Sequence, residues 1–292
     1  MSKPNSTDQA KQSHSVHQDP WAKLRQFTDA RIGLGRAGTS LPTSELLRFQ
    51  LSHAQAIDAV HVPLDVDKLS EQFECSSVLS SYLPIQRLHS KAADRMEYLQ
   101  RPDLGRQLDK PSIDRLEALS GEAYDLVFVL ADGLSSYAIS HHAAAFVELF
   151  INRLQEDEST KELKIAPICV VQQGRVAVGD DVCEALNAKQ VVLLIGERPG
   201  LSSPDSMGLY LTWGAQRGME DSMRNCISNI RPEGLKYQAA VHKSIYLLNE
   251  SRRLALTGVN LKDRSEDSLL ETEQTQQFSL TNLLPNDANV GE

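Results

Sequence analysis

Three continuous apolar stretches mark the middle of the chain. They are DLVFVLAD (residues 125–132), IAPICVVQ (165–172) and QVVLLIGE (190–197), and all three are rich in Val, Ile and Leu. Such stretches, without alternation of polar side chains, are typical of strands buried on both faces, as in a parallel sheet covered by helices. We therefore predict three parallel strands here, and LYLTW (209–213) is a candidate for a fourth.

The segments between these stretches have helical spacing. Apolar side chains recur three or four residues apart after the first stretch, and a shorter helix fits residues 180–188. Alternation of strand and helix predicts right-handed crossovers in a layered sheet. Two more helices are predicted after the fourth strand, one through residues 219–230 and one over about 235–255. The first helix is defined by Ile139, Ala143, Phe146, Phe150 and Leu154.

The chain ahead of the sheet has a helical pattern instead. From Ser44 onward, five side chains spaced three or four residues apart form one face of a helix, and residues 85–99 repeat this pattern more weakly. We expect this face to be buried, with its histidine satisfied in the core. The five residues are Leu46, Phe49, His53, Ile57 and Val60.

These patterns divide the chain into four segments. Residues 1–18 contain almost no apolar side chains, which predicts disorder. Residues 19–118 are predicted to form a helical N-terminal domain, and residues 119–262 an α/β domain with a Rossmann-like, mostly parallel sheet flanked by helices. Residues 263–292 are predicted to be an acidic, flexible tail.

Charge and composition exclude several classes of protein. The net charge of the 292 residues is −9, of which −6 falls on the tail, where seven acids face one base, so the rest carries −3. This near-neutral body has no basic stripe, which argues against nucleic-acid binding. No apolar run approaches the ~20 residues that span a membrane. The four cysteines form no C-x-x-C pair, which favours a reducing compartment, and we expect a soluble cytoplasmic protein.

A short glycine motif raises the possibility of a nicotinamide-dependent oxidoreductase. ARIGLGRAG (30–38) places Gly33, Gly35 and Gly38 as G-x-G-x-x-G, and Asp58 follows at a suitable distance. A dinucleotide-binding fingerprint requires a strand that leads into the glycines. The upstream residues have helical spacing instead, so we interpret the glycines as a turn between two helices.

Ligands of open parallel sheets bind beyond the carboxyl ends of the strands. Three glycine-rich loops emerge there, at 131–136, 172–181 and 196–208, and such loops suit a ligand that needs close backbone approach. They contain no G-K-[ST] and no G-x-S-x-G, which argues against nucleoside triphosphates and a serine hydrolase. His141 and His142 are adjacent on a helix, point about 100° apart and cannot both face one metal.

Three side chains are candidates for contact with a ligand. Glu197 follows directly on an apolar stretch and could accept hydrogen bonds from amides. An ion pair with Arg198 is the alternative. Cys226 lies near the apolar face of the predicted helix through 219–230, where it could simply be a small buried hydrophobe. Val176, an apolar residue in a loop at the edge of the sheet, could lie against a flat ligand.

Four long blocks together resemble one known family. They are residues 19–65, DLVFVLADGLSSYAISHHA (125–143), VVLLIGERPGLSSPDSMGLYLTWG (191–214) and MRNCISNIRPEGLKYQAA (223–240). They resemble the small (light) subunit of ethanolamine ammonia-lyase, and the similarity extends from about residue 19 to about residue 263.

The resemblance implies a function and a cofactor. The family's enzyme uses adenosylcobalamin to convert ethanolamine to acetaldehyde and ammonia by a radical mechanism. A large subunit with a TIM-type barrel holds the substrate and the catalytic residues, and cobalamin lies between the subunits of a hetero-oligomer. The family's cobalamin contacts correspond to Val176, Glu197 and Cys226, and no catalytic residue or metal ligand is implied in this chain.

Two patterns expected in some cobalamin systems are missing from the sequence. The chain has no D-x-H-x-x-G motif, whose histidine replaces the cofactor's own base on cobalt, so we predict that the cofactor stays base-on. Small subunits packaged in a bacterial microcompartment begin with an amphipathic helix. Residues 1–18 show no apolar stripe, which favours the free cytoplasmic enzyme.

Two other hypotheses remain open from the sequence. The chain could be a scaffolding subunit that supports a partner without touching the cofactor. It could also be the nicotinamide-dependent oxidoreductase suggested by the glycine motif.

Overall fold

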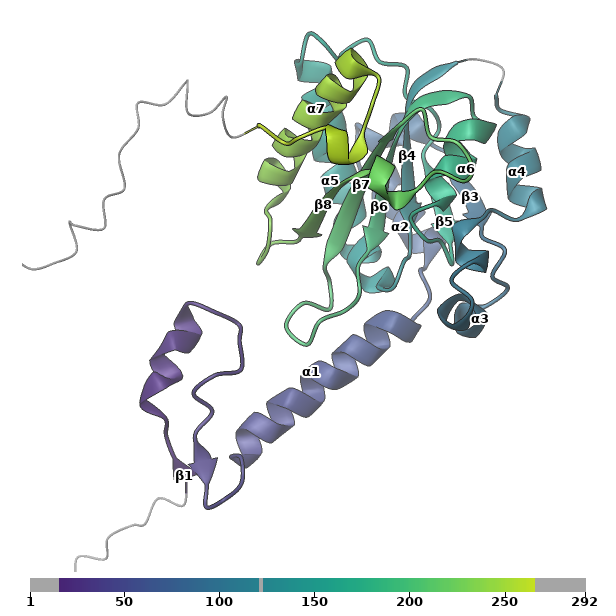
Figure 1. Cartoon of the computed structure of the whole chain (residues 1–292). Coiled ribbons are helices and arrows are strands. Elements are labelled where there is room, and N and C mark those ends of the chain that lie inside the picture. The colour runs from purple at the N-terminus through teal and green to yellow at the C-terminus, as the bar shows by residue number, and fades with distance from the viewer. Residues whose placement is uncertain (1–15, 121–122, 266–292) are drawn as a thin grey trace, which may run out of the picture.

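The computed structural model describes residues 16–120 and 123–265, which are built around one six-stranded sheet (Figure 1). The strands are β3 (Gln86–His89), β4 (Tyr124–Ala131), β5 (Cys169–Gln172), β6 (Ala188–Gly196), β7 (Met207–Trp213) and β8 (Asn225–Ile230). Their order across the sheet is β3–β5–β4–β6–β7–β8. The first four are parallel, and β7 and β8 are antiparallel to their neighbours. The predicted mostly parallel sheet is confirmed.

Different helices cover the two faces of the sheet, because alternate residues of a strand point to opposite sides. Phe128 of β4 lies in a core shared with α5 (Ser136–Glu156) and α7 (Tyr237–Leu254). Val127 and Val129 lie in a second core with α6 (Val178–Ala185) and α4 (Lys110–Glu117). The helices predicted over 139–154, 180–188 and about 235–255 and the strand predicted at 209–213 are confirmed.

Helix α5 illustrates why these residues form this layer. The side chain of Ser135 caps it by accepting a hydrogen bond from the backbone N–H of Ala138. Its apolar face is fully buried, and the rings of Phe150 and Phe128 meet edge to face with centroids 5.3 Å apart. Burial of each such ring contributes about 1.5–3 kcal/mol, so the apolar face fixes α5 on the sheet.

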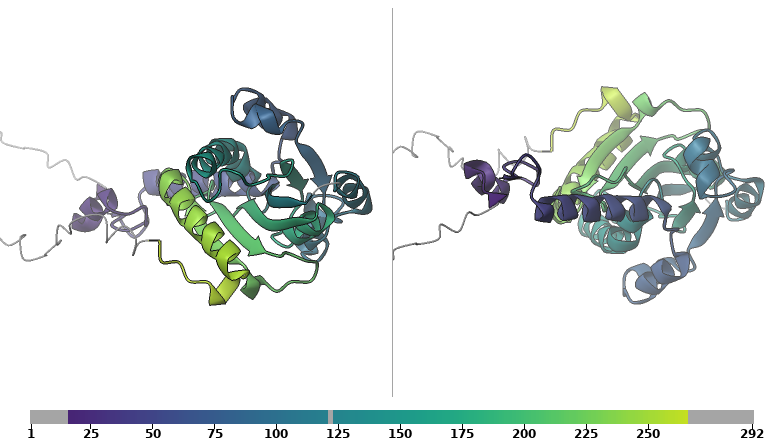
Figure 2. Two further views of the ribbon diagram at one scale, coloured as in Figure 1. Left: turned by 90° about the horizontal axis from the view of Figure 1, so that it is seen from above. Right: turned by 90° about the horizontal axis from the view of Figure 1, so that it is seen from below.

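An N-terminal arm, defined here as residues 16–62, extends from this body. It contains β1 (Val16–His17), the 3-10 helix η1 (Pro20–Gln26), β2 (Arg36–Ala37) and α1 (Thr43–His61). In Figures 1 and 2 the first three stand apart from the sheet, and α1 leads back to it.

The glycine motif lies in this arm. Gly33, Gly35 and Gly38 have φ of 56°, 74° and 59°, values that glycine adopts readily. They turn the chain from η1 toward α1, and no buried strand leads into them. The interpretation as a turn is confirmed, and the structure offers no dinucleotide-binding context.

Two predicted helices are wrong. Residues 86–89 form the edge strand β3, and the chain becomes helical only in α3 (Arg95–Gln100). Residues 225–230 form β8, preceded by a single 3-10 turn at Asp221–Met223. Ile227 and Ile230 are both buried although they are three residues apart, because Asn229 adopts φ of 60° and breaks the alternation of the strand. The two buried isoleucines are therefore three residues apart, which is the spacing expected of a helix.

Between the arm and β3 lie α2 (Val66–Glu74) and the 3-10 helix η2 (Leu79–Tyr82), and Leu69 and Phe73 of α2 join the core of α5. Because β3 pairs with β5, part of the segment 19–118 belongs to the sheet, and a separate helical domain over that range stays a prediction. Most of 1–18 and of 263–292 lies outside the described residues. No helix among those that are described is long and apolar enough to cross a membrane.

Candidate functional site

The β4–α5, β5–α6 and β6–β7 loops leave the sheet at one edge, because β4, β5 and β6 are parallel. The buried carboxylate of Asp132 ties the first two together by accepting hydrogen bonds from the backbone N–H groups of Gln173 (2.9 Å) and Gly174 (3.0 Å). Burial raises the pKa of Asp132. The predicted common edge is confirmed, and Asp132 has a structural role in it.

The crevice between β4 and β6 is closed by the loops themselves. The backbone N–H of Leu134 donates to the carbonyl of Gly196 (2.9 Å). A Cβ on Gly196 would lie 1.9 Å from the carbonyl oxygen of Ser135, and one on Gly133 would lie 2.3 Å from the oxygen of Gly196. These two glycines therefore allow close approach between two loops. At this crevice the close backbone approach is between the two loops, and a ligand that uses the other loop glycines stays a prediction.

Glu197 is the first residue beyond β6, at the edge of the sheet. Its Oε2 accepts hydrogen bonds from the hydroxyl of Ser206 and from the backbone N–H of Asn229 (3.2 Å). Its Oε1 has no hydrogen-bond partner within 16–120 and 123–265, and it faces Gly208, where a Cβ would lie 2.9 Å away. Glu197 and Arg198 are both described, and they do not form the ion pair that was the alternative. Glu197 is thus held in place with one oxygen available.

Cys226 lies opposite Tyr210 in the β7–β8 ladder, so the two side chains are neighbours on one face of the sheet. Burial raises the pKa of Tyr210, and Cys226 and the negative charge of Glu197 raise it further. Burial also raises the pKa of the Cys226 thiol, although its side chain is exposed. The interpretation of Cys226 as a buried hydrophobe on a helix was wrong. It lies in an accessible cluster with the hydroxyl of Tyr210 and the negative charge of Glu197.

Val176 lies in the β5–α6 loop, half-buried against the same core as Tyr210. Two residues later α6 begins, and Asp180 of α6 forms a two-pronged ion pair with Arg224 at 2.5 and 2.8 Å. Arg224 precedes Cys226 by two residues, so this ion pair holds the start of α6 beside β8. We call Val176, Glu197, Tyr210 and Cys226 the candidate face.

The far end of the β6–β7 loop is anchored on the opposite side of the sheet. His142 of α5 contacts Asp205 (3.1 Å) through Nε2 and the hydroxyl of Tyr237 (2.6 Å) through Nδ1. Arg231 lies 3.6 Å from the other oxygen of Asp205. His142 is therefore satisfied within the fold. No group of three His, Cys, Asp or Glu side chains among the described residues is arranged to hold a metal.

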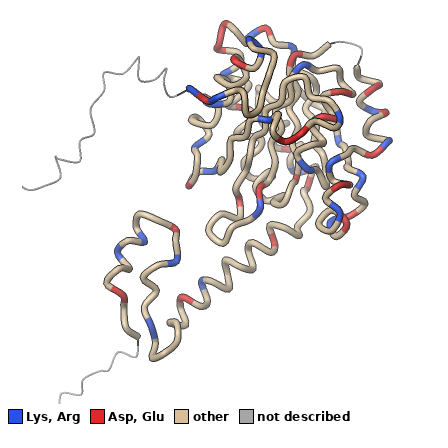
Figure 3. Tube along the Cα trace, viewed as in Figure 1, with Lys and Arg blue, Asp and Glu red and all other residues tan. Residues whose placement is uncertain are grey.

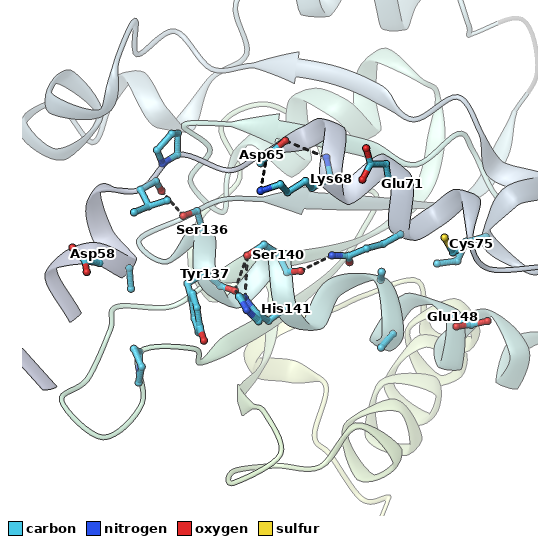
Figure 4. A pocket seen from close by; sticks show the side chains of 18 of the residues that line it. Asp58, Asp65, Lys68, Glu71, Cys75, Ser136, Tyr137, Ser140, His141 and Glu148 are labelled. Carbon is cyan, nitrogen blue, oxygen red and sulfur yellow. Dashed lines mark hydrogen bonds and ion pairs between the residues drawn. The ribbon is translucent and has the colours of Figure 1, made fainter. Parts of the chain in front are cut away.

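A cavity of about 1070 Å³ lies elsewhere, between α1, α2 and the start of α5 (Figure 4). The rings of Tyr137 and His141 lie there with centroids 3.9 Å apart and planes tilted by 33°, and Gln72 donates to the carbonyl of Ser140 (3.0 Å). Pro204 of the β6–β7 loop also lines it, but no residue of the candidate face does. The cavity and the candidate face are therefore separate features.

Comparison with known proteins decides the family. The ethanolamine ammonia-lyase light chain family matches residues 18–262. The ethanolamine ammonia-lyase small subunit of Pseudomonas aeruginosa (strain UCBPP-PA14) is 52% identical over 262 residues, which cover 88% of this chain and 92% of the relative. That of Xanthomonas campestris pv. campestris (strain B100) is 51% identical over 272 residues, covering 91% and 96%.

This chain belongs to the ethanolamine ammonia-lyase light chain family. The resemblance found in the sequence is therefore confirmed over nearly all of the described residues. In this light chain, sequence reasoning missed Tyr210 and Gly208 as members of the same surface. Their alternation along the strand 207–213 could have indicated it, since both point to the face that carries Glu197.

Proposed function

We propose that this light chain, together with the large subunit of the lyase, converts ethanolamine to acetaldehyde and ammonia with adenosylcobalamin as cofactor. In this proposal the candidate face forms part of the cobalamin site at the interface between the subunits, with the cofactor base-on. Family membership supports the reaction. The observation that carries the role of this chain is the available carboxylate of Glu197 beside the exposed Cys226.

The chemistry of these side chains suits a corrinoid. A corrin ring carries several carboxamide side chains, and the available Oε1 of Glu197 can accept a hydrogen bond from an amide N–H. Gly208 leaves that oxygen accessible, because a Cβ at this position would lie 2.9 Å from it. Val176 and Cys226 offer small, weakly polar surface to a flat ring. The residues present therefore fit the group.

The protein's share of the reaction is to bind and to orient. When bound, adenosylcobalamin supplies the radical by homolysis of its cobalt–carbon bond, which is chemistry of the cofactor itself. Glu197 is fixed by Ser206 and Asn229, so it presents its free oxygen in one direction. We assign no acid or base step to this chain and place the catalytic residues in the barrel of the large subunit. A cytoplasmic location is part of the same proposal.

The test is the cofactor affinity of the reconstituted complex carrying Glu197→Gln. Loss of a charged acceptor removes about 1.5–3 kcal/mol, so the Kd for adenosylcobalamin is expected to rise at least about tenfold. Equilibrium dialysis with the cofactor's visible absorbance measures it. Glu74→Gln, on an exposed carboxylate at the end of α2, is the control and should bind like the wild type.

An unchanged Kd with Glu197→Gln would favour the scaffolding hypothesis, in which the light chain supports the large subunit without touching the cofactor. Gly208→Ala provides an independent check, because it adds a methyl group beside Oε1 without removing charge. It should weaken cofactor binding in the same direction.

A further inference from the structure

The apolar face of α1 is exposed. Leu46, Phe49 and Ile57 are 43%, 43% and 45% exposed, although the sequence pattern predicted that this face is buried. His53, expected in the core, is exposed as well. The reason is that α1 buries only Ala59 against the body. We call Leu46, Phe49, His53, Ile57 and Val60 the arm stripe.

Other parts of the arm are equally uncovered. Trp21 is 66% exposed and Phe27 is 81% exposed, and η1 has no buried residue. Single exposed apolar side chains are common, but a contiguous set over a long helix marks an interaction surface. Since α1 has 19 residues, it offers a rod about 28 Å long.

The charges of α1 argue for a protein partner. Glu45, Arg48 and Asp58 are its only charged residues, and both signs are present, so no basic side attracts an anionic membrane. Figure 3 shows the long uncharged stretch between Arg48 and Asp58. An uncharged helical face of this kind suits a hydrophobic groove or the apolar side of another helix.

The arm stripe is also connected to the candidate face. The guanidinium of Arg31 lies 5.6 Å from the ring centroid of Phe49, and it donates to the carbonyl of Leu201 (3.3 Å) in the β6–β7 loop. That loop begins with Glu197. A partner that completes the cofactor site at Glu197 therefore lies beside the stripe, whereas a second copy of this chain would not supply the missing half.

We propose that the arm stripe is a docking surface for the large subunit, which covers α1 with an apolar groove or helix. The identity of the partner rests on the proposed function. The surface itself follows from the exposure of α1 and from Arg31, which links Phe49 of α1 to the β6–β7 loop. In the complex the stripe is buried, as its sequence pattern requires.

The test measures assembly without cofactor, so that it is independent of Glu197. Phe49→Asp and Ile57→Asp are made singly in the full chain, and the Kd for the large subunit is measured by isothermal titration calorimetry. Each is expected to weaken assembly at least about tenfold, because burial of such a side chain contributes about 1.5–3 kcal/mol. The control is Val259→Asp, a 63% exposed apolar residue near the other end of the chain, which should assemble normally.

Several outcomes would overturn the inference. If both stripe variants bind the large subunit with the wild-type Kd, the arm stripe is not the docking surface. The proposed function would stay intact, since the wild-type complex still forms. If the stripe variants lose only self-association of the light chain, measured by analytical ultracentrifugation, and still bind the large subunit normally, the stripe is a contact with a second copy of this chain. If an aspartate unfolds α1 by circular dichroism, Phe49→Ser and Ile57→Ser replace it and must weaken assembly too. Failure of the wild type to bind the large subunit would instead contradict the proposed function.

Discussion

At the scale of single residues, the thiol of Cys226 is accessible and yet poorly ionised. Its surroundings remove water from the sulfur, which disfavours the thiolate, and the negative charge of Glu197 adds to this effect. The neighbouring hydroxyl of Tyr210 lowers the pKa of the thiol without cancelling the increase. In the proposed cofactor site the sulfur is therefore a neutral thiol at pH 7.

We predict that Cys226 reacts slowly with iodoacetamide at pH 7, since the thiolate is the nucleophile. Because the pKa is raised above the ordinary value of 9.0, the rate should still be increasing above pH 9. Mass spectrometry of pH-dependent labelling in the full chain measures this. Glu197→Gln removes the nearby charge and should move the profile to lower pH. Rapid labelling of the wild type at pH 7 would contradict the assignment.

At the scale of elements, the ion pair between Asp180 and Arg224 joins α6 to β8. Both side chains are only 2% exposed, and Arg224 is bound further by Asp221 and by the carbonyl of Met219. Burial raises the pKa of Asp180, so its charge depends on the partner. The position of Val176 relative to Cys226 depends on this pair, because it links their two elements.

We predict that Arg224→Met lowers the free energy of unfolding by about 3–5 kcal/mol, because it leaves a buried carboxylate unpaired. Urea denaturation measures the loss. The double variant Asp180→Leu with Arg224→Met should recover a large part of it, since no charge then remains unpaired. Arg253→Met, which breaks an exposed pair with Glu250, should cost less than about 1 kcal/mol. Equal losses for the two arginines would contradict this account.

The elements also show what the sequence reveals and why. β4 and β6 were predictable because both of their faces are buried, which leaves a continuous apolar run. β3 was not, because a four-residue edge strand is too short to show a period. β8 was mistaken for a helix because of its irregular residue, Asn229. Glu197 was singled out from its place after a strand, whereas Tyr210 could have been reached only through the alternation of side chains along the strand 207–213.

At the scale of the whole molecule, the arm and the body differ in how they are held. The body encloses two cores on either side of the sheet, whereas the arm from Val16 to Val62 buries little more than Pro42 and Ala59. The sequence predicted an apolar face on α1 correctly. It could not show whether that face is covered by this chain or by another, because the periodicity is the same in both cases.

We predict that trypsin cuts the isolated light chain first in the arm, because segments with few buried contacts open most easily. The expected sites are Lys23, Arg25, Arg31, Arg36 and Arg48. Addition of the large subunit should slow these cuts at least about tenfold, since a bound segment is cleaved only after release. Serum albumin at the same concentration is the control. First cuts within β4 or α5, monitored by mass spectrometry, would contradict the prediction.

The interlocked backbones of Gly133 and Gly196 have a consequence for the residue that follows them. Neither loop can shift without the other, because the two backbones are so close that a Cβ at either glycine would clash with the other loop. Glu197 is consequently preorganised before any partner arrives. In the proposed cofactor site, association at this position therefore sacrifices little conformational entropy, and most of the interaction energy of the carboxylate is retained as affinity.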